Sequence, residues 1–376
     1  MSHDFNIKVI LLQHKSQNSH SGMRRFPEHQ PKILMRSTAL FLFAILCLSS
    51  HAQEEESFTP VIKGTLRGKY EYQPQEGEGR FEVRTARVSF SGKVRPKVGY
   101  KAEIDLCDEG VIKMLDAYTR LSPWDSFDFT IGQMRVPFTI DAHRSPHQQY
   151  FANRSFIAKQ VGNVRDVGAM AGFQFNVGVP VHLQAGLFNG SGLTGQKDYW
   201  TKGVNFSAKS LIYFPCHVDV QLSIQKIKPD VFTVMMYDAG VTYHYKNFLA
   251  EAEYLYKTYA HDSYKAVHAI DVFANYDIPV KDRKSLIRKV SPLVRYDFMT
   301  DHSDGSRYLD GKKNVAGELI TNDSQRHRVT GGVTLSMGKA FVSDIRINYE
   351  KYFYKAGGTP KVSERDKVVV EFMTHF

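Results

Sequence analysis

The sequence lacks the features that mark several common classes of protein. Its three cysteines in 376 residues are too few for a small secreted scaffold held by disulfides. Beyond residue 52 it has no apolar run near the roughly 20 residues of a membrane-spanning helix, which excludes a helical membrane bundle. Only 23% of residues are charged, and 20 tyrosines and 25 phenylalanines exclude wholesale disorder. Two solutions remain: a soluble protein, or one that crosses a membrane by alternating apolar and polar residues.

One apolar run, ALFLFAILCL at 39–48, lies near the N-terminus. It follows Lys32 and Arg36 and precedes a small-x-Ala exit that ends at Ala52. A basic region, a short apolar core and such an exit describe a secretory signal peptide, for which Met35 is the better start. We therefore expect two parts: an N-terminal extension and signal peptide at 1–52, cleaved after Ala52, and one mature domain at 53–376.

The mature part has a mild charge. Removing residues 1–52 leaves 43 basic and 37 acidic side chains, a formal net charge of +6. Because this charge is evenly spread and the protein is exported, no nucleic-acid partner is expected. Cys107 and Cys216 remain, which allows one disulfide without requiring it. A lipoprotein anchor on Cys47 is disfavoured, because Leu46 precedes it where a small residue is needed.

Apolar and polar residues alternate along most of the mature sequence. In 344–350 the odd positions are Ile or Tyr and the even positions are Asp, Arg, Asn and Glu, and 218–225 alternates in the same way. Alternation sends the two kinds of side chain to opposite faces of a β-strand. We count sixteen such segments: 60–72, 80–94, 97–106, 112–121, 126–133, 166–177, 180–189, 202–214, 217–227, 231–245, 247–259, 264–277, 288–300, 326–337, 341–353 and 366–376.

The connections between these segments alternate between short and long. Nearly every second one is a tight turn, with 278–287 as the exception, and the others include 134–165, 190–201, 301–325 and 354–365. Short turns at one rim and long loops at the other are expected of an outer-membrane barrel, whose short turns face the periplasm. A soluble sandwich gives no reason for this asymmetry.

The two faces of the segments indicate which solvent each one contacts. The apolar faces would form a very large exposed patch on a soluble barrel, and the opposite faces carry too many charges of both signs for a dry core. Each face is in a suitable solvent if the apolar face contacts lipid and the polar face lines a water-filled lumen. The sequence therefore predicts an all-β fold, a sixteen-stranded antiparallel transmembrane barrel. Aromatic residues near the segment ends and the terminal Phe376 are consistent with it.

A set of short blocks carries more information than the alternation alone. They are GRFEVRTAR (79–87), IDL (104–106), KMLDAY (113–118), IGQMRVPF (131–138), RSP (144–146), YFANRS (150–155), RDVGAM (165–170) and AGLFNG (185–190). In these blocks the sequence resembles the phosphate-selective porin O/P family of Gram-negative outer-membrane channels. The resemblance implies a homotrimer that passes small anions (phosphate, polyphosphate or chloride) across the outer membrane. The family's selectivity is attributed to pore-lining Arg and Lys, and Thr85 separates an arginine pair that is often adjacent there.

The longest connection, 134–165, follows the fifth segment, near the place where general porins fold a loop into the barrel. It contains one acidic residue, Asp141, against several basic ones. Arginine suits oxyanions because its planar guanidinium donates parallel hydrogen bonds, and a narrow pore concentrates the potential of a few cations. We expect an inward-folded constriction that binds anions through Arg135, Arg144, Arg154, Lys159 and Arg165. The alternative is that these are solvated surface residues or trimer contacts.

Parity assigns a second group of cations to the lumen. Arg84 and Arg87 cannot both face it unless a bulge separates them. For each residue the alternative is an ion pair with a neighbouring acid, such as Glu103, Asp105, Asp116 or Glu350. The predicted basic lining consists of Lys63, Arg67, Lys69, Arg84, Arg87, Lys101, Arg120 and Arg346.

Catalytic motifs are weak. His143 and Ser145 have no third orienting group, and His143 and His147 flank Pro146 and lack the Glu of a zinc-protease helix. The GxGxxG match at 190–195 lies between two predicted strands, so a loop is a better reading than a nucleotide site. We expect no catalytic residue, metal or cofactor. The runner-up functions are a non-conducting structural or adhesin barrel and, less favoured, a barrel hydrolase.

Overall fold

The computed structural model describes residues 58–108, 110–159, 164–193, 195–229, 232–282, 284–305, 319–338, 341–355 and 362–376. These residues belong to one unit of the chain. The expected signal peptide, its cleavage after Ala52 and the start at Met35 lie outside the described residues and stay predictions. None of the described helices is long and apolar enough to cross a membrane.

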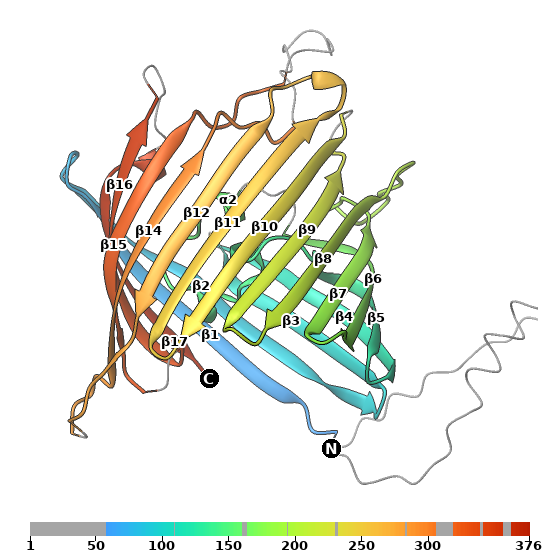
Figure 1. The fold of residues 1–376 in the computed structure, drawn as a ribbon, viewed down its shortest axis with the longest axis horizontal. Helices are drawn as coiled ribbons and strands as arrows, with labels where there is room; N and C mark the ends of the chain where they lie inside the picture. Colours follow the sequence, from blue (N-terminus) through green and yellow to red (C-terminus); the bar gives the residue numbers. More distant parts are fainter. Residues whose placement is uncertain are drawn as a thin grey trace, which may run out of the picture. The chain divides into compact units, whose positions relative to one another are not determined.

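Sixteen antiparallel strands close into a ring (Figure 1). Each of the sixteen predicted segments coincides with one strand, which confirms the predicted fold class. The strands are β1 (Val61–Gln73), β2 (Glu78–Arg95), β3 (Val98–Asp108), β4 (Val111–Trp124), β5 (Phe127–Arg135), β6 (Arg165–Asn176), β7 (Pro180–Phe188), β8 (Asn205–Phe214), β9 (Val218–Ile227), β10 (Val234–Tyr245), β11 (Phe248–Tyr259), β12 (Val267–Tyr276), β14 (Lys289–Met299), β15 (Arg326–Ser336), β16 (Ser343–Tyr354) and β17 (Lys367–His375).

The ring closes where the first strand meets the last. β1 pairs with β2 on one side and with β17 on the other, from Thr65↔His375 to Tyr72↔Val368. Two further backbone hydrogen bonds join Gly64 and Phe376, from the Gly64 N–H (2.7 Å) and from the Phe376 N–H (3.0 Å). A Cβ on Gly64 would come within 2.2 Å of the Phe376 ring, so the absence of a side chain at this position is what admits the terminal aromatic.

The alternation places polar side chains inside and apolar ones outside. On β1, Arg67 is 3% exposed and points inward, whereas the preceding residue, Leu66, is 51% exposed on the outer face. The same contrast holds on β11, where Glu253 is buried and Tyr254 is exposed. This inverted pattern is the one expected when hydrocarbon contacts the outside of a barrel.

The exception among the tight turns is an extended hairpin. The two-residue strand β13 (Ile278–Pro279) lies outside the ring and pairs only with the start of β14, at Val290 and Lys289. Figure 1 shows this hairpin projecting beyond the short-turn rim. Among the described residues the two cysteines are free: Cys107 lies near the end of β3 and Cys216 in the β8–β9 turn at the other rim, so the disulfide between them that the sequence allowed is absent.

The connection between β5 and β6 folds into the barrel, as predicted. Residues 136–159 of this connection are called the inner loop here and contain η1 (Asp141–His143), η2 (Pro146–Gln148) and α2 (Phe156–Lys159). Phe156 and Ile157 are 0% exposed and belong to an apolar cluster with side chains of β10, β11, β12 and β14. Because this cluster lies inside the ring, the loop packs against one side of the interior and cannot swing freely in it. The remaining short helices are η3 (Ala260–Asp262) and η4 (Val362–Glu364).

Candidate functional site

Arginines of the barrel hold the main chain of the inner loop. Four guanidinium groups donate hydrogen bonds to loop carbonyls. Each also lies beside an acidic side chain, as in the Arg67–Glu371 pair at 2.5 Å and the Arg328–Asp297 pair at 2.8 Å. The four contacts are Arg67 to Ala152 O (2.8 Å), Arg295 to Asn153 O (3.0 Å), Arg328 to Arg154 O (2.7 Å) and Arg346 to His147 O (2.9 Å).

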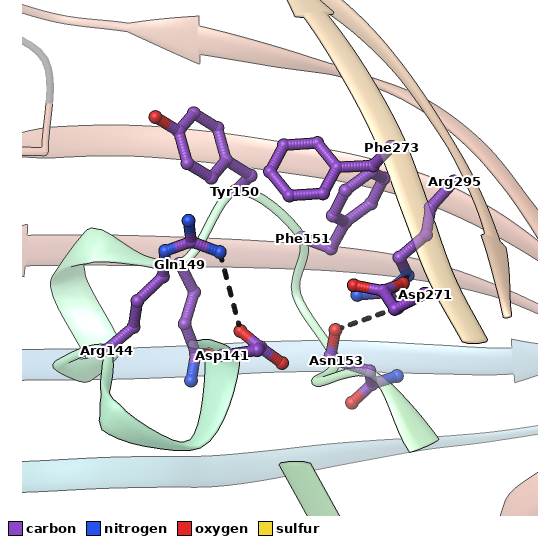
Figure 2. Close-up of a pocket in the computed structure, with 9 residues that line it drawn as sticks. All are labelled: Asp141, Arg144, Gln149, Tyr150, Phe151, Asn153, Asp271, Phe273 and Arg295. Atoms are coloured by element: carbon purple, nitrogen blue, oxygen red, sulfur yellow. Dashed lines mark hydrogen bonds and ion pairs between the residues drawn. The ribbon is translucent and has the colours of Figure 1, made fainter. Parts of the chain in front are cut away.

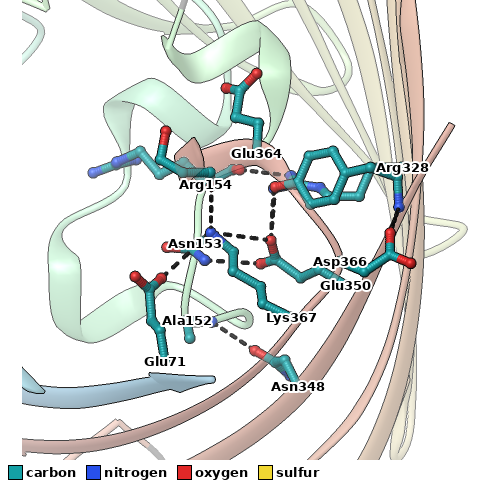
Figure 3. A network of polar contacts seen from close by, with 12 residues as sticks. Glu71, Ala152, Asn153, Arg154, Arg328, Asn348, Glu350, Glu364, Asp366 and Lys367 are labelled. Atoms are coloured by element: carbon teal, nitrogen blue, oxygen red, sulfur yellow. Dashed lines mark hydrogen bonds and ion pairs between the residues drawn. The ribbon is translucent and has the colours of Figure 1, made fainter. Parts of the chain in front are cut away.

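Polar groups of β16 complete this attachment, as Figure 3 shows. The Ala152 N–H donates to Asn348 Oδ1 (2.8 Å), and the Asn153 amide donates to Glu350 Oε1 (2.9 Å). Glu350 also accepts a hydrogen bond from the Tyr352 hydroxyl (2.8 Å). A buried carboxylate is stable only when its oxygens are satisfied, so this part of the interior is a bonded network that fixes the loop.

A second attachment joins η1 to β11. The Arg144 guanidinium forms a bidentate pair with Glu251, with one distance of 2.8 Å, and stacks over the Tyr150 ring. Burial lowers the pKa of Arg144, but the adjacent Glu251 carboxylate outweighs burial and raises it above its usual value. The cavity in Figure 2, between this part of the loop and the barrel, has a volume of only about 10 Å³, so the loop closely covers the strands behind it.

The inner loop thus divides the interior into two surfaces. We call β1, β9–β12 and β14–β17 the covered wall, because their inward side chains are buried beneath the loop. We call β2–β8 the open wall, because several inward cations there keep contact with solvent, among them Arg84 (31% exposed), Lys101 (27%) and Arg120 (40%), although Arg165 and Lys209 are buried. Any solute in the barrel therefore passes between the inner loop and the open wall.

A bulge brings both arginines of the 84–87 block to the interior. The β1–β2 register shifts between Arg67 and Gly68, and Arg84 takes the extra position. Arg84 lies 3.4 Å from Glu82, and Arg87 lies 2.8 Å from the Asp105 carboxylate. This is the condition that the sequence set for both residues to face the lumen.

Two arginines, one directly before the inner loop and one within it, have few carboxylates nearby to neutralise their charge. Arg135 donates to the His143 carbonyl (2.5 Å), and within the described residues no carboxylate lies within 4.0 Å of it. Arg154 donates to the carbonyls of Asp141 and Arg144, and its nearest carboxylate is Asp141 at 3.9 Å. Burial first, and then the neighbouring arginines, lowers the pKa of Arg154 to about 10.

The pKa values of other loop groups report the same positive potential. Burial and then Lys209 and Arg135 hold the pKa of His143 well below its usual value, so its ring is neutral. Burial alone would raise the pKa of Asp141, but Arg154 and Arg144 outweigh it and lower that pKa. The interior at Arg135 and Arg154 is therefore a place where cations repel one another and where an anion would be stabilised.

Two of the loop assignments need correction. Arg135 and Arg165 are the last residue of β5 and the first of β6, where they are direct register partners, so the loop is shorter than 134–165 at both ends. Arg165 is buried between Asp116 (2.6 Å) and Glu103 (2.9 Å). Lys159 ends α2, and its side chain lies outside what the structure describes.

The remaining predicted residues lie in three settings. Arg67, Lys69 and Arg346 are buried in ion pairs, and Arg87 and Lys101 form the pairs with Asp105 and Asp116 that were the alternative to a pore role. Arg120 lies 3.4 Å from Asp128, and Lys63 is exposed towards the short-turn rim. Sequence reasoning did not single out Arg295, Arg328 and Lys209, although strand parity places all three on the polar face.

The weak motifs have structural explanations. The His147 ring stacks on His375, with centroids 3.8 Å apart and planes within 7°. Asp166 accepts hydrogen bonds from the N–H groups of Gly190 (2.6 Å) and Gly192 (3.2 Å), so the described glycines of the GxGxxG match anchor the β7–β8 connection. Among the described residues no group of three His, Cys, Asp or Glu side chains is arranged to hold a metal ion.

Comparisons with known proteins agree with this architecture. A family model described as phosphate-selective porin O and P matches residues 65–256. No curated protein sequence matches the chain. Among solved structures, the chain is similar to an anion-selective porin from Comamonas acidovorans, with 13% identity, a TM-score of 0.58, and 85% of this chain and 99% of that one covered.

Two further solved structures share the fold. The outer-membrane channel DcaP of Acinetobacter baumannii has 12% identity and a TM-score of 0.56, with 87% of this chain and 100% of that one covered. The outer-membrane protein OmpT of Vibrio cholerae, in its trimer form, has 11% identity and a TM-score of 0.55, with 85% and 99% covered. At these identities the likeness shows the fold, a sixteen-stranded outer-membrane barrel.

Proposed function

Because the chain belongs to the phosphate-selective porin O and P family, we propose that it is a passive outer-membrane pore that prefers small anions, with phosphate or polyphosphate as its solutes. The observation that carries the anion preference is the pair Arg135 and Arg154, whose guanidinium groups are satisfied by carbonyls rather than carboxylates. A carbonyl does not neutralise the charge, so both residues contribute positive potential to the passage beside the open wall.

The open wall supports repeated weak binding rather than one tight site. Its half-exposed cations lie close to acids, as Lys101 does to Glu103 (2.8 Å) and Arg120 to Asp128 (3.4 Å), so each offers an anion only part of its charge. Conduction requires this, because a solute that binds too strongly at one place does not leave. Phosphate can exchange hydrogen bonds from one planar guanidinium to the next along such a surface.

The family and the trimer form of the structurally similar Vibrio cholerae outer-membrane protein OmpT support a homotrimer in a Gram-negative outer membrane, with lipid around its perimeter. The outward apolar residues of the strands supply surface for both lipid and neighbouring subunits. Chemical cross-linking of the detergent-solubilised barrel is expected to give a three-subunit species.

The test of anion preference is a reversal-potential measurement in planar bilayers across a KCl gradient. The wild-type pore should favour chloride, and added phosphate should reduce the chloride current. Arg135→Ala and Arg154→Ala should each lower the anion-to-cation permeability ratio several-fold and weaken the phosphate block. Lys97→Ala, a cation of the β2–β3 turn that bonds to the Pro123 carbonyl, is the matched control and should change neither.

Three outcomes would contradict the proposal in different ways. If the wild-type pore preferred cations, Arg135 and Arg154 could not be an anion-selectivity filter. Unchanged phosphate block in both alanine variants would leave an anion pore but exclude these two residues. A barrel that inserts without conductance steps would favour the structural or adhesin function instead.

A further inference from the structure

A row of rings crosses the outer face of the barrel near the long-loop rim. It consists of Tyr256 on β11, His268 on β12, Phe298 on β14, His327 on β15 and Phe353 on β16, and we call it the imidazole row. The strand register places Tyr256 opposite His268, and Phe298 opposite His327, which in turn lies opposite Phe353. All five have the outward parity of exposed neighbours such as Val272 and Val329, so they are directed away from the pore.

Each histidine of the row is held in the same way by a tyrosine of the preceding strand. The Tyr254 hydroxyl lies 2.7 Å from His268 Nδ1, and the Tyr296 hydroxyl lies 2.7 Å from His327 Nδ1. Tyr254 lies opposite Ile270, and Tyr296 lies opposite Val329. Each of these partners is two positions after the histidine, so the two Tyr–His contacts have the same diagonal geometry.

This arrangement determines what the imidazoles present outward. We assign the phenol O–H as the donor to Nδ1, which places the ring proton on Nε2. Ring contacts on the same face, His268 with Tyr256 at 5.2 Å and His327 with Phe298 at 4.7 Å, hold the planes. The row therefore offers two oriented N–H donors among aromatic side chains.

Positive side chains lie close to the row. Lys265, three residues before His268, is at the rim and lies 2.5 Å from Asp301. Lys351 is outward on β16, opposite Val329 and two residues before Phe353, and pairs with Asp366. Lys355 follows the end of β16, is exposed and contributes to the field at Asp301. Lys265 and Lys355 are thus exposed cations at the same rim as the row.

We propose that the imidazole row binds the phosphate groups of lipid headgroups in the leaflet around the long-loop rim. Aromatic belts of membrane proteins lie at the depth of the headgroups, so the rings place both Nε2–H donors where lipid phosphates are found. A phosphate oxygen accepts such donors strongly, and the rim lysines add charge attraction. The proposal depends on residence in a membrane but not on anion conduction, because the row lies on the opposite side of the strands from the pore.

The experiment uses the full barrel in a neutral detergent and native mass spectrometry to titrate two probes. These are lipid A, which carries phosphates on a glycolipid, and its dephosphorylated form. The wild type should bind the phosphorylated probe at least about tenfold more tightly, the effect of two lost hydrogen bonds. Excess inorganic phosphate should displace little lipid, because a free ion lacks acyl chains to pack against the outer face.

Matched variants locate the effect. The double variant His268→Phe/His327→Phe keeps the rings and their volume but removes both N–H donors, so the preference for the phosphorylated lipid should fall about tenfold. Tyr254→Phe/Tyr296→Phe should give a smaller loss, because the imidazoles remain but are no longer oriented. His217→Phe is the control: His217 lies beside Tyr245 at the other rim, 5.8 Å between ring centroids, and should have no effect.

Two results would overturn the proposal. One is equal binding of the phosphorylated and dephosphorylated lipids by the wild type, and the other is an unchanged preference in the double phenylalanine variant. Heat-dependent mobility of the folded barrel on gels confirms that each variant is folded. Single-channel conductance should be the same in all of them, so a failure here is distinguishable from a failure of the proposed anion pore.

Discussion

The covered wall and the open wall carry the same kinds of residue but use them differently. On the covered wall, Arg328 is buried, contacts Asp297 and Glu350, and donates to a carbonyl of the inner loop. On the open wall, Arg120 has one acid at 3.4 Å and keeps much of its surface in solvent. Both arginines occupy inward positions of alternating strands. For these two arginines, what separates a structural cation from one available to a solute is whether the loop lies over it.

The largest expected effect tests the covered wall. Arg328→Met removes the partner of two buried carboxylates and should destabilise the barrel by about 3–5 kcal/mol. Urea unfolding in detergent, followed by circular dichroism, measures this. Arg328→Met combined with Asp297→Asn should cost less than the sum of the single changes, because the buried charge is removed with its partner.

Arg95→Met, at the exposed end of β2, serves as the control for this experiment and should change stability by less than about 0.5 kcal/mol. Equal stability of Arg328→Met and Arg95→Met would mean that the covered network does not hold the barrel together.

A smaller effect is expected where the inner loop meets β11. Glu251→Gln removes the bidentate partner of Arg144 and should destabilise the barrel by about 2 kcal/mol. It should also leave the Arg144 charge without its compensating carboxylate, so the reversal potential should shift towards stronger anion preference. A loss of stability with no shift in the reversal potential would show that Arg144 does not influence the passage.

On the open wall the order of effects reverses. Arg120→Ala should change stability by less than about 1 kcal/mol, since a half-exposed ion pair contributes little. It should nevertheless reduce the anion-to-cation permeability ratio measurably, because the charge faces the passage. If Arg120→Ala destabilised the barrel as strongly as Arg328→Met, the distinction between the two walls would fail.

The smallest effect concerns acidity at the junction of the loop with β17. Burial first, then His375, Arg346 and Lys63, lowers the pKa of His147 to about 4. The unfolded chain takes up a proton near pH 6.5, so this group's share of stability is complete above that value and falls as the pH drops towards 4. His147→Gln should flatten that part of the profile of stability against pH, as measured by unfolding at a series of pH values.

The strands and their two faces could be predicted from the sequence because they depend on local alternation. The geometry of a strand imposes a period of two, so the sequence of a segment such as 344–350 already indicates which side chains lie on each face. The fate of individual cations could not be predicted in this way. Arg67 and Arg84 both face inward, but one lies beneath residues 150–155 and the other does not, and that depends on contacts across some 70–85 positions of the chain.

Two further details needed the structure. The bulge that admits both Arg84 and Arg87 to the interior has no distinct signature in the sequence, although the need for it was evident from parity. The imidazole row was also invisible in the sequence, because His268 and His327 are 59 positions apart and their alignment depends on the register of the intervening strand.

The seam between Gly64 and Phe376 has a consequence for how this molecule is assembled. Every strand of the ring except β1 and β17 pairs with the ring strands directly before and after it in the chain. Hairpins can therefore form in succession while the free edges of β1 and β17 stay open. Only when β17 pairs with β1 are the main-chain groups of both edge strands satisfied. Closure is thus a single step, and a variant without β17 would leave the main-chain groups of β1 and β16 unpaired at two exposed edges.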